Sequence, residues 1–171
     1  MAKLSDQAIA LRPAASGEVA ALTELCLRSK AHWGYDDAFM AACRKELTVS
    51  DAAANGPFLH VATAHGVLAA MAEIGEEDGT WHLEKLFVDP PFMSIGLGRR
   101  LFDWAARTAA EHGATLLEIA ADPDAAPFYR HHGAVDAGKV PSSSIPGRFL
   151  PRLVVELADR DRPTTARRDS N

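Results

Sequence analysis

A glycine-containing segment at residues 93–100 has the composition of a turn that binds an anion. Its sequence, MSIGLGRR, lies between a strand-like segment and the strongest helical pattern of the chain. Main-chain N–H groups at such a junction, together with the positive end of the following helix, can bind a phosphate or pyrophosphate. Gly96 and Gly98 allow the main chain to approach the anion closely. Arg99 and Arg100 add positive charge, and residues 90–100 include no acid, so the segment predicts a phosphate-binding turn.

A purely structural turn would use glycine in the same way, and the wider sequence narrows the nucleotides that fit. A P-loop requires GxxxxGK[ST], which is absent. A Rossmann fingerprint requires a third glycine where this chain has Leu101. Glu118 and Asp122 do lie about twenty residues downstream, near the position of a ribose-binding acid. An NAD-dependent oxidoreductase therefore stays a remote alternative.

Strand and helix patterns surround this turn in a definite order. Apolar alternation and turn residues predict strands at residues 8–11, 58–64, 67–74, 81–88, 115–121, 135–140 and 150–157. Helices are predicted at 16–29, 36–47 and 98–112, with a short one between Asp122 and Gly133. Ser16 and Asp36 are predicted N-caps, and residues 75–79 a turn. The order predicts a mixed α/β fold, with a mostly antiparallel central sheet of about six to seven strands and helices on both faces.

Composition limits the size of the protein and its partners. A chain of 171 residues, 47% of them hydrophobic, fits one domain, predicted at residues 1–158 and followed by a polar, disordered tail at 159–171. The net charge of -5, with no basic stripe among aromatics, argues against a nucleic-acid partner. No long apolar run is present, so we expect no membrane partner and a cytoplasmic location.

Cysteine and histidine spacing predicts neither a disulfide framework nor a metal site. Cys26 and Cys43 lack the paired spacing of zinc ligands and are expected to be small buried thiols. The histidines form no HExxH or comparable ligand pattern. We therefore expect no metal cofactor.

Two linked motifs resemble those of the GCN5-related N-acetyltransferase (GNAT) family. The family signature is a strand ending in an L-x-V-type segment, then [R/Q]-x-x-G-x-[G/A], then a long helix, and the sequence here is LFV at residues 86–88 and MSIGLG at 93–98. A second family pattern, N-x-x-x-F-Y, is matched by DAAPFY at residues 124–129. The motifs occur in the family's order, about thirty residues apart, and the resemblance extends over about residues 8–157.

The resemblance implies that the chain uses acetyl-CoA. In the family, the main chain of the fourth strand pairs with the pantetheine arm and the turn binds the pyrophosphate. The residues implied to contact the coenzyme are Leu86, Phe87, Val88, Met93, Ser94, Ile95, Gly96, Leu97, Gly98, Arg99, Arg100, Asp124 and Phe128.

Two of these residues depart from the family pattern. Met93 stands where arginine or glutamine is usual, so a side-chain contact to phosphate is missing, for which Arg99 or Arg100 could compensate. Asp124 replaces the usual asparagine and removes an amide donor. Both changes predict weaker coenzyme binding.

Catalytic roles also follow from the resemblance. Glu84 lies two residues before Leu86 and is the implied base that takes the amine proton, directly or through water. Tyr129 matches the family tyrosine that donates to the departing thiolate. The alternatives are a solvated Glu84 paired with Lys85, and a Tyr129 that only packs beside Phe128.

The implied acceptor is a primary amine of a small molecule or peptide. In similar proteins the acceptor cleft is walled by the regions that correspond here to residues 32–35, including His32, Trp33 and Tyr35, and to residues 142–148. The aromatic residues could equally be core residues between the first two helices. Similar proteins are often homodimers. A non-catalytic acyl-CoA-binding module is the main alternative to an enzyme.

Overall fold

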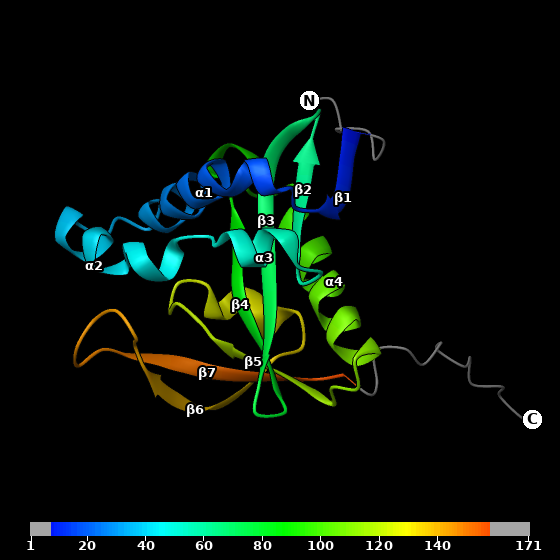
Figure 1. Ribbon diagram of the computed structural model, residues 1–171. Helices are drawn as coiled ribbons and strands as arrows, with labels where there is room; N and C mark the ends of the chain where they lie inside the picture. The colour runs from blue at the N-terminus through cyan, green and yellow to red at the C-terminus, as the bar shows by residue number, and fades with distance from the viewer. Residues whose placement is uncertain (1–7, 158–171) are drawn as a thin grey trace, which may run out of the picture.

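Seven strands form one sheet in the computed structural model, which describes residues 8–157 (Figure 1). The strands are β1 (Ile9–Pro13), β2 (Leu59–Ala64), β3 (Val67–Glu77), β4 (Thr80–Val88), β5 (Leu116–Ala120), β6 (Val135–Pro141) and β7 (Phe149–Glu156). Their spatial order is β1-β2-β3-β4-β5-β7-β6, and within residues 8–157 the pairing of β4 with β5 is the one parallel pairing. The predicted mixed, mostly antiparallel sheet is therefore confirmed. The tail predicted at residues 159–171 lies outside the described residues.

Helices cover both faces of the sheet (Figure 1). They are α1 (Val19–Ala31), α2 (Asp37–Leu47), α3 (Asp51–Asn55), α4 (Leu97–Glu111) and α5 (Ala126–His131). Alternation along β3 separates the two cores: Met71 packs with Leu22 of α1, whereas Ala70 and Ala72 pack with Leu101 of α4. This period of two is the pattern expected of a strand buried on both faces.

The helix after the glycine turn is the best-packed element. Its apolar stripe is almost completely buried and consists of Leu97, Leu101, Phe102, Ala105, Ala106 and Ala109. The helix starts at Leu97 and ends at Glu111, within one residue of the prediction at each end. Because this stripe is fixed against β3 and β4, the turn before it is held at a defined place on the sheet.

Three local predictions were wrong. The turn predicted at residues 75–79 is shorter, since Glu76 and Glu77 continue β3 by pairing with β4, and the left-handed turn consists of Asp78 (φ 49°) and Gly79 (φ 82°). Ser16 is not an N-cap but lies inside a short 3-10 helix. The helix α3 was not predicted, although Ser50 caps it by accepting from the Ala53 N–H at 3.1 Å.

The two halves of the sheet separate after a short junction. The parallel ladder between β4 and β5 consists of two pairs, Trp81 with Leu117 and His82 with Glu118. The rest of β4, from Leu83 to Val88, makes no ladder to β5. Its outer edge therefore presents main-chain donors and acceptors toward the space between the strands.

The two cysteines, Cys26 and Cys43, are free and buried, as the sequence predicted. Among the helices at residues 8–157, none has the length and apolar content to cross a bilayer. The same residues contain no group of three side chains suited to a metal ion.

Candidate active site

A cavity of about 580 Å³ opens between the end of α1, the second half of β4, the turn before α4, and α5. Among the residues that line it are Leu86, Phe87, Val88, Met93, Ser94, Gly96, Leu97, Gly98, Arg99, Asp124 and Phe128. These were all predicted to contact the coenzyme, and the fold brings them together although they come from three separate segments. The cavity is thus formed at the place where β4 and β5 separate.

Main-chain N–H groups of the turn are available to an anion. The backbone is left-handed at Ser94 (φ 69°) and Gly96 (φ 88°), a conformation that a serine rarely adopts and that is common at binding sites. Gly96 is the N-cap of α4 and supplies no side-chain cap. The first main-chain bond of the helix runs from Arg100 N–H to the Gly96 carbonyl. The preceding N–H groups are therefore left for a ligand.

Close packing explains the glycine at position 98. A Cβ at this position would lie 3.4 Å from Cζ of Phe128 and 3.7 Å from Cγ2 of Val88. These distances leave room for a methyl group and nothing larger. The glycine brings α4, α5 and the end of β4 together around the cavity.

Arg28 and Asp89 fix the end of β4 to α1. The guanidinium donates two hydrogen bonds, from Nε to Oδ1 at 3.0 Å and from Nη2 to Oδ2 at 2.9 Å. Asp89 is buried and its N–H bonds the Ala69 carbonyl at 2.8 Å. This bidentate ion pair fixes the chain just after β4, the strand that lines the cavity.

Tyr129 lies inside the cavity wall with its hydroxyl unused. The residue is 6% exposed, and its ring packs against Phe102 and Phe128 at centroid distances of 5.6 and 5.2 Å. Yet it lines the cavity, its hydroxyl makes no hydrogen bond within residues 8–157, and the oxygen is not a fully buried atom, so it is accessible from the cavity. Burial, and then the nearby Asp122 carboxylate, raise the pKa of Tyr129. A buried, unpartnered phenol at a cavity is a candidate donor to a ligand.

Glu84 lies at a β-bulge in β4, two residues before Leu86 of the cavity wall. Lys85 pairs with Glu73 and Leu83 with Ile74, so Glu84 is an extra residue in the β3–β4 ladder. Its Oε1 lies over Gly75, where a Cβ would come within 3.1 Å. Lys85 donates to Glu73 at 3.0 Å, so the expected alternative of a Glu84–Lys85 pair is not formed.

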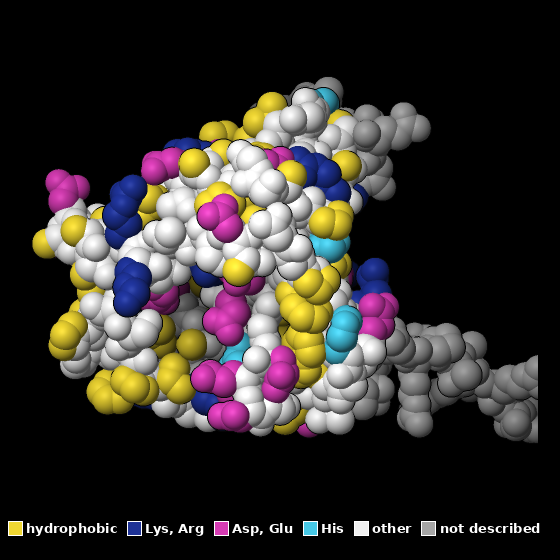
Figure 2. Space-filling view, viewed as in Figure 1, with side chains coloured by type: hydrophobic (Ala, Val, Ile, Leu, Met, Phe, Trp, Pro, Cys, Tyr) yellow, Lys and Arg dark blue, Asp and Glu magenta, His cyan; other side chains and the backbone are white. Residues whose placement is uncertain are grey.

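The surroundings of Glu84 favour its protonated form. Partial burial raises the pKa of the Glu84 carboxylate. The negative charges of Glu73 and Glu77 add to that rise, while His82 and Lys85 oppose it. Acidic side chains gather on this face of the molecule, where the β3–β4 hairpin exposes Glu76 and Glu77 (Figure 2). Such a carboxylate is a better base at neutral pH than an unperturbed one.

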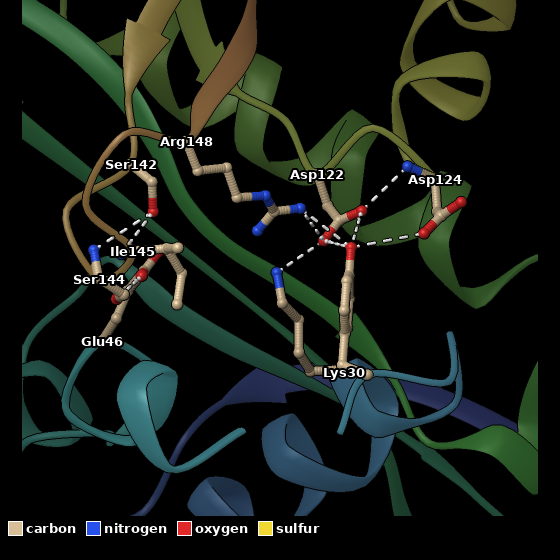
Figure 3. Close-up of polar contacts among 9 residues, drawn as sticks. Lys30, Glu46, Asp122, Asp124, Ser142, Ser144, Ile145 and Arg148 are labelled. Atoms are coloured by element: carbon tan, nitrogen blue, oxygen red, sulfur yellow. Dashed lines mark hydrogen bonds and ion pairs between the residues drawn. The ribbon is translucent and has the colours of Figure 1, made fainter. Parts of the chain in front are cut away.

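A cluster of charged side chains forms the opposite side of the cavity (Figure 3). Asp122, at the end of β5, accepts hydrogen bonds from Lys30 Nζ at 2.7 Å and from the Tyr35 hydroxyl at 2.8 Å. Arg148 Nη2 donates to the Tyr35 oxygen at 3.0 Å and lies 3.6 Å from Asp122 Oδ2. Lys30, Asp122 and Asp124 also line the cavity. The cluster joins α1, the α1–α2 loop, the β5–α5 loop and the β6–β7 loop.

Hydrogen bonds set the protonation states in this cluster. Burial alone would raise the pKa of Asp122, but donation from Lys30, from the Asp124 N–H and from Tyr35 more than offsets it, so the pKa is lowered. Burial and the Asp122 carboxylate raise the pKa of Tyr35 to about 12. At neutral pH the cluster therefore consists of an ionised carboxylate, a neutral phenol and two cations.

The sequence matches a known protein family. The family model described as the acetyltransferase (GNAT) domain matches residues 13–140. The chain belongs to the GNAT acetyltransferase family. No protein with curated function matches the sequence.

Solved structures share the GNAT fold. A GCN5-related N-acetyltransferase from Rhodopseudomonas palustris is 24% identical, with a TM-score of 0.71 over 86% of this chain and 95% of that one. The PaiA N-acetyltransferase of Thermoplasma acidophilum, solved with coenzyme A, is 13% identical, with a TM-score of 0.69 over 86% and 98%. The putative acetyltransferase yncA of Salmonella typhimurium, solved with acetyl-CoA, is 22% identical, with a TM-score of 0.61 over 92% and 99%. At these identities the similarity shows the fold.

Five of the remaining predicted site residues of this GNAT protein do not line the cavity, whereas Trp33 does. Ile95 packs toward the α4 core, and Arg100 lies one helical position beyond Arg99. Trp33 lines the cavity and is 46% exposed, so it is not a core residue, whereas Tyr35 belongs to the charged cluster and His32 contacts Trp33 edge to face. Glu84 is not among the lining residues either.

Several lining residues were not predicted. They are Ser29, Lys30, Phe92, Asp122, Ala125, His131 and His132. Lys30 and Asp122 are far apart in the sequence, and no motif connects them. Asp122 and Glu118 had been weighed as ribose-binding acids, but Asp122 bonds Lys30 and Glu118 pairs with Arg152. Both carboxylates therefore have partners within the protein, and the NAD-dependent alternative loses the observation that supported it.

Proposed function

We propose that this GNAT protein transfers the acetyl group of acetyl-CoA to a primary amine. The observation that carries the proposal is a cavity that combines a main-chain anion site, a free strand edge and an unpartnered phenol. Two structural neighbours were solved with coenzyme A or acetyl-CoA, which supports the same ligand here. The acceptor is a small molecule or a peptide.

The cavity residues fit the parts of acetyl-CoA. The N–H groups around Gly96 and Gly98 suit the diphosphate, because they lie at the uncapped N-terminus of α4. The unpaired edge of β4 at Leu86, Phe87 and Val88 suits the amide-rich pantetheine arm. Bound in this way, the coenzyme presents a thioester, an acyl donor that an amine can attack without a metal.

A base is required because most amines are protonated at neutral pH. An amine with the pKa of lysine, about 10.4, is neutral in roughly one molecule in 2,500 at pH 7, which costs about 4.6 kcal/mol if nothing assists. Glu84 is the proposed base. Its side chain lies over Gly75 and does not line the cavity, so we propose that the proton reaches it directly or through a water molecule.

Tyr129 is the proposed acid. Its buried hydroxyl donates to the sulfur as the thiolate leaves, and the elevated pKa of the phenol makes full proton transfer harder. The same burial raises the pKa of a thiol, as it does for Cys26, whose pKa is about 12. The two pKa values therefore rise together, and the proton transfer stays feasible.

Thiol release across a broad amine panel tests the proposal. Purified protein with acetyl-CoA should release coenzyme A only when an acceptor amine is present, and the product should carry an acetylated amine by mass spectrometry. Tight coenzyme binding without thiol release from any amine would instead indicate a non-catalytic acyl-CoA-binding module. Stabilisation by NAD and none by acetyl-CoA would contradict both readings.

A further inference from the structure

Arg148 is held at the end of the β6–β7 loop, next to the cavity-lining residue Asp122. It ends the β6–β7 loop, in which the Ser142 N–H bonds the Arg148 carbonyl at 2.7 Å and the Arg148 N–H bonds the Ile145 carbonyl at 3.2 Å. Ile145 packs into the α1–α2 core, and Ser144 bonds Glu46 of α2 (Figure 3). The position of the guanidinium is therefore fixed by the fold, although it belongs to a loop.

The hydrogen-bonding capacity of Arg148 is mostly unused. A guanidinium carries five N–H donors in a planar fork. Its polar contacts, to Tyr35 and Asp122, both use Nη2, and within residues 8–157 Nε and Nη1 have no hydrogen-bond partner. Figure 3 shows another nitrogen of the fork turned away from Asp122. The side chain is 20% exposed, and neither nitrogen is a buried unsatisfied atom, so both are accessible to a ligand from solvent.

Charge in the cluster is unbalanced at the same place. Lys30 and Arg148 flank the stacked rings of Tyr35 and Phe39, with Lys30 Nζ 5.4 Å and Arg148 Cζ 5.4 Å from the Tyr35 centroid. Both cations share a single carboxylate, Asp122. That carboxylate already accepts from Lys30, Tyr35 and the Asp124 N–H.

The neighbouring Asp124 does not restore the balance. Its carboxylate lies 3.4 Å from the Tyr35 hydroxyl and makes no ion pair with either cation within the described residues. A second planar anion beside Arg148 would use the free donors and give this cation a carboxylate partner of its own.

We propose that Arg148 binds a carboxylate of the acceptor, so that the acceptor is an amino acid or a peptide end carrying both an amine and a carboxylate. This inference rests on the proposed acetyl transfer to an amine. Asp122 connects the two sites, because it lines the cavity and also lies next to Arg148. Arg148 is thus a specificity-determining residue that orients the amine toward the cavity.

A matched panel of α-amino acids and their α-carboxamides tests the inference. Each pair differs only in the group that would meet Arg148, and the assay is run at a pH where both amines are unprotonated. Two quantities are measured: kcat/KM from coenzyme A release, and affinity for the protein–coenzyme A complex by calorimetry. We expect the carboxylate of the preferred pair to be favoured about 10-fold or more.

Variants locate the preference. Arg148→Gln should abolish this preference, because the carboxylate loses its partner, and Arg148→Lys, which keeps the charge without the fork, should retain part of it. The control is Arg44→Gln on the exposed face of α2, which should keep the wild-type ratio. The ratio within each variant does not depend on how much of the protein is folded, so a partly unfolded variant still gives an answer.

The outcomes separate this inference from the proposed function. Equal affinity for carboxylates and carboxamides, no binding by any member, or a preference that survives Arg148→Gln would overturn the inference. Transfer to simple amines without such a preference would leave the acetyltransferase proposal standing. A preference for carboxylates in binding, lost in Arg148→Gln, would support the inference even if no thiol were released.

Discussion

The two sides of the cavity are built from different chemical groups. On the coenzyme side, main-chain N–H groups of the turn before α4 and the free edge of β4 face the cavity. On the other side, side chains of Lys30, Asp122 and Arg148 meet in one cluster. A main-chain site tolerates changes in side chains so long as the backbone path is kept. A side-chain site depends on each partner, which allows relatives with one fold to differ in the molecules they accept.

Removal of the Tyr129 hydroxyl should have the largest effect. It removes a side-chain group proposed for catalysis and leaves the main-chain binding site intact. Tyr129→Phe is expected to lower kcat by at least about 100-fold. The affinity for coenzyme A should stay within about twofold, since the ring and its packing on Phe102 and Phe128 are kept. Steady-state kinetics and calorimetry measure the two quantities. Full turnover in the variant would remove the acid role.

Loss of the Glu84 carboxylate should produce a pH-dependent defect. Glu84→Gln is expected to lower kcat/KM about 100-fold at neutral pH, and the defect should shrink as rising pH deprotonates the amine. In the wild type, activity should fall as pH drops through the raised pKa of Glu84. Rates measured across a pH series check both trends.

Gly75→Ala is the matched control for the position of that carboxylate. The new Cβ would lie 3.1 Å from Glu84 Oε1, so it should displace the group without removing its charge. We expect a smaller loss with the wild-type pH profile. A defect of constant size at every pH in Glu84→Gln would count against base catalysis.

Breaking the ion pair between Lys30 and Asp122 should lower the stability of the protein. Asp122→Asn leaves Lys30 without an ionised partner in a site where both side chains are nearly covered, at 13% and 11% exposed. We expect a decrease of about 3 kcal/mol in the free energy of unfolding. Urea denaturation measures it, and Asp136→Asn, in an exposed pair with Arg130, is the control expected to change little.

The acid response of the same variant gives a second readout. Because the folded-state pKa of Asp122 is lowered, its ionised form stabilises the protein above the pKa of the unfolded chain, and this contribution is lost as pH falls through the folded-state pKa. Asp122→Asn should lack that part of the acid-induced loss. An unchanged stability profile from neutral to acidic pH would show that the cluster contributes little to the fold.

Filling the space at Gly98 should damage the main-chain wall. Gly98→Val places atoms beyond the Cβ, which is itself 3.4 Å from Phe128, and should weaken coenzyme A binding about tenfold. Gly98→Ala is the control, since a methyl group fits at that distance. Calorimetric titration of both variants measures the effect, and equal affinities for the two would contradict this view of the glycine.

Replacement of Met93 by a charged side chain should have the smallest effect. Met93 lines the cavity where arginine or glutamine is usual in the family, and Met93→Arg should tighten coenzyme A binding about threefold. Met93→Leu should leave affinity unchanged. A large loss in Met93→Leu would mean that the wall depends on side chains after all.

The sequence predicted the two walls unequally, for physical reasons. The glycine turn is local: the need for left-handed backbone at Gly96 and the stripe of α4 are both visible in consecutive residues. The cluster of Lys30, Asp122 and Arg148 exists only because the loops at residues 32–36 and 142–148 come together over β5. Nothing in the local sequence records that meeting.

The same reasoning applies to the sheet. The seven strands along the chain followed from apolar patterns and turn residues, and the mixed, mostly antiparallel sheet with helices on both faces was predicted correctly. The bulge at Glu84 was not, because it depends on the register between β3 and β4. The extension of β3 through Glu77 was mistaken for a turn, since exposed strand ends carry the same acids as loops. Roles of Glu84 and Tyr129 stay predictions until they are tested.

A crystal structure of the protein with coenzyme A tests the central claim most directly. We predict that the diphosphate accepts hydrogen bonds from main-chain N–H groups around Gly96 and Gly98, with the pantetheine along β4 and the sulfur beside the Tyr129 hydroxyl. Coenzyme bound elsewhere, with the turn before α4 making no contact to phosphate, would contradict the account.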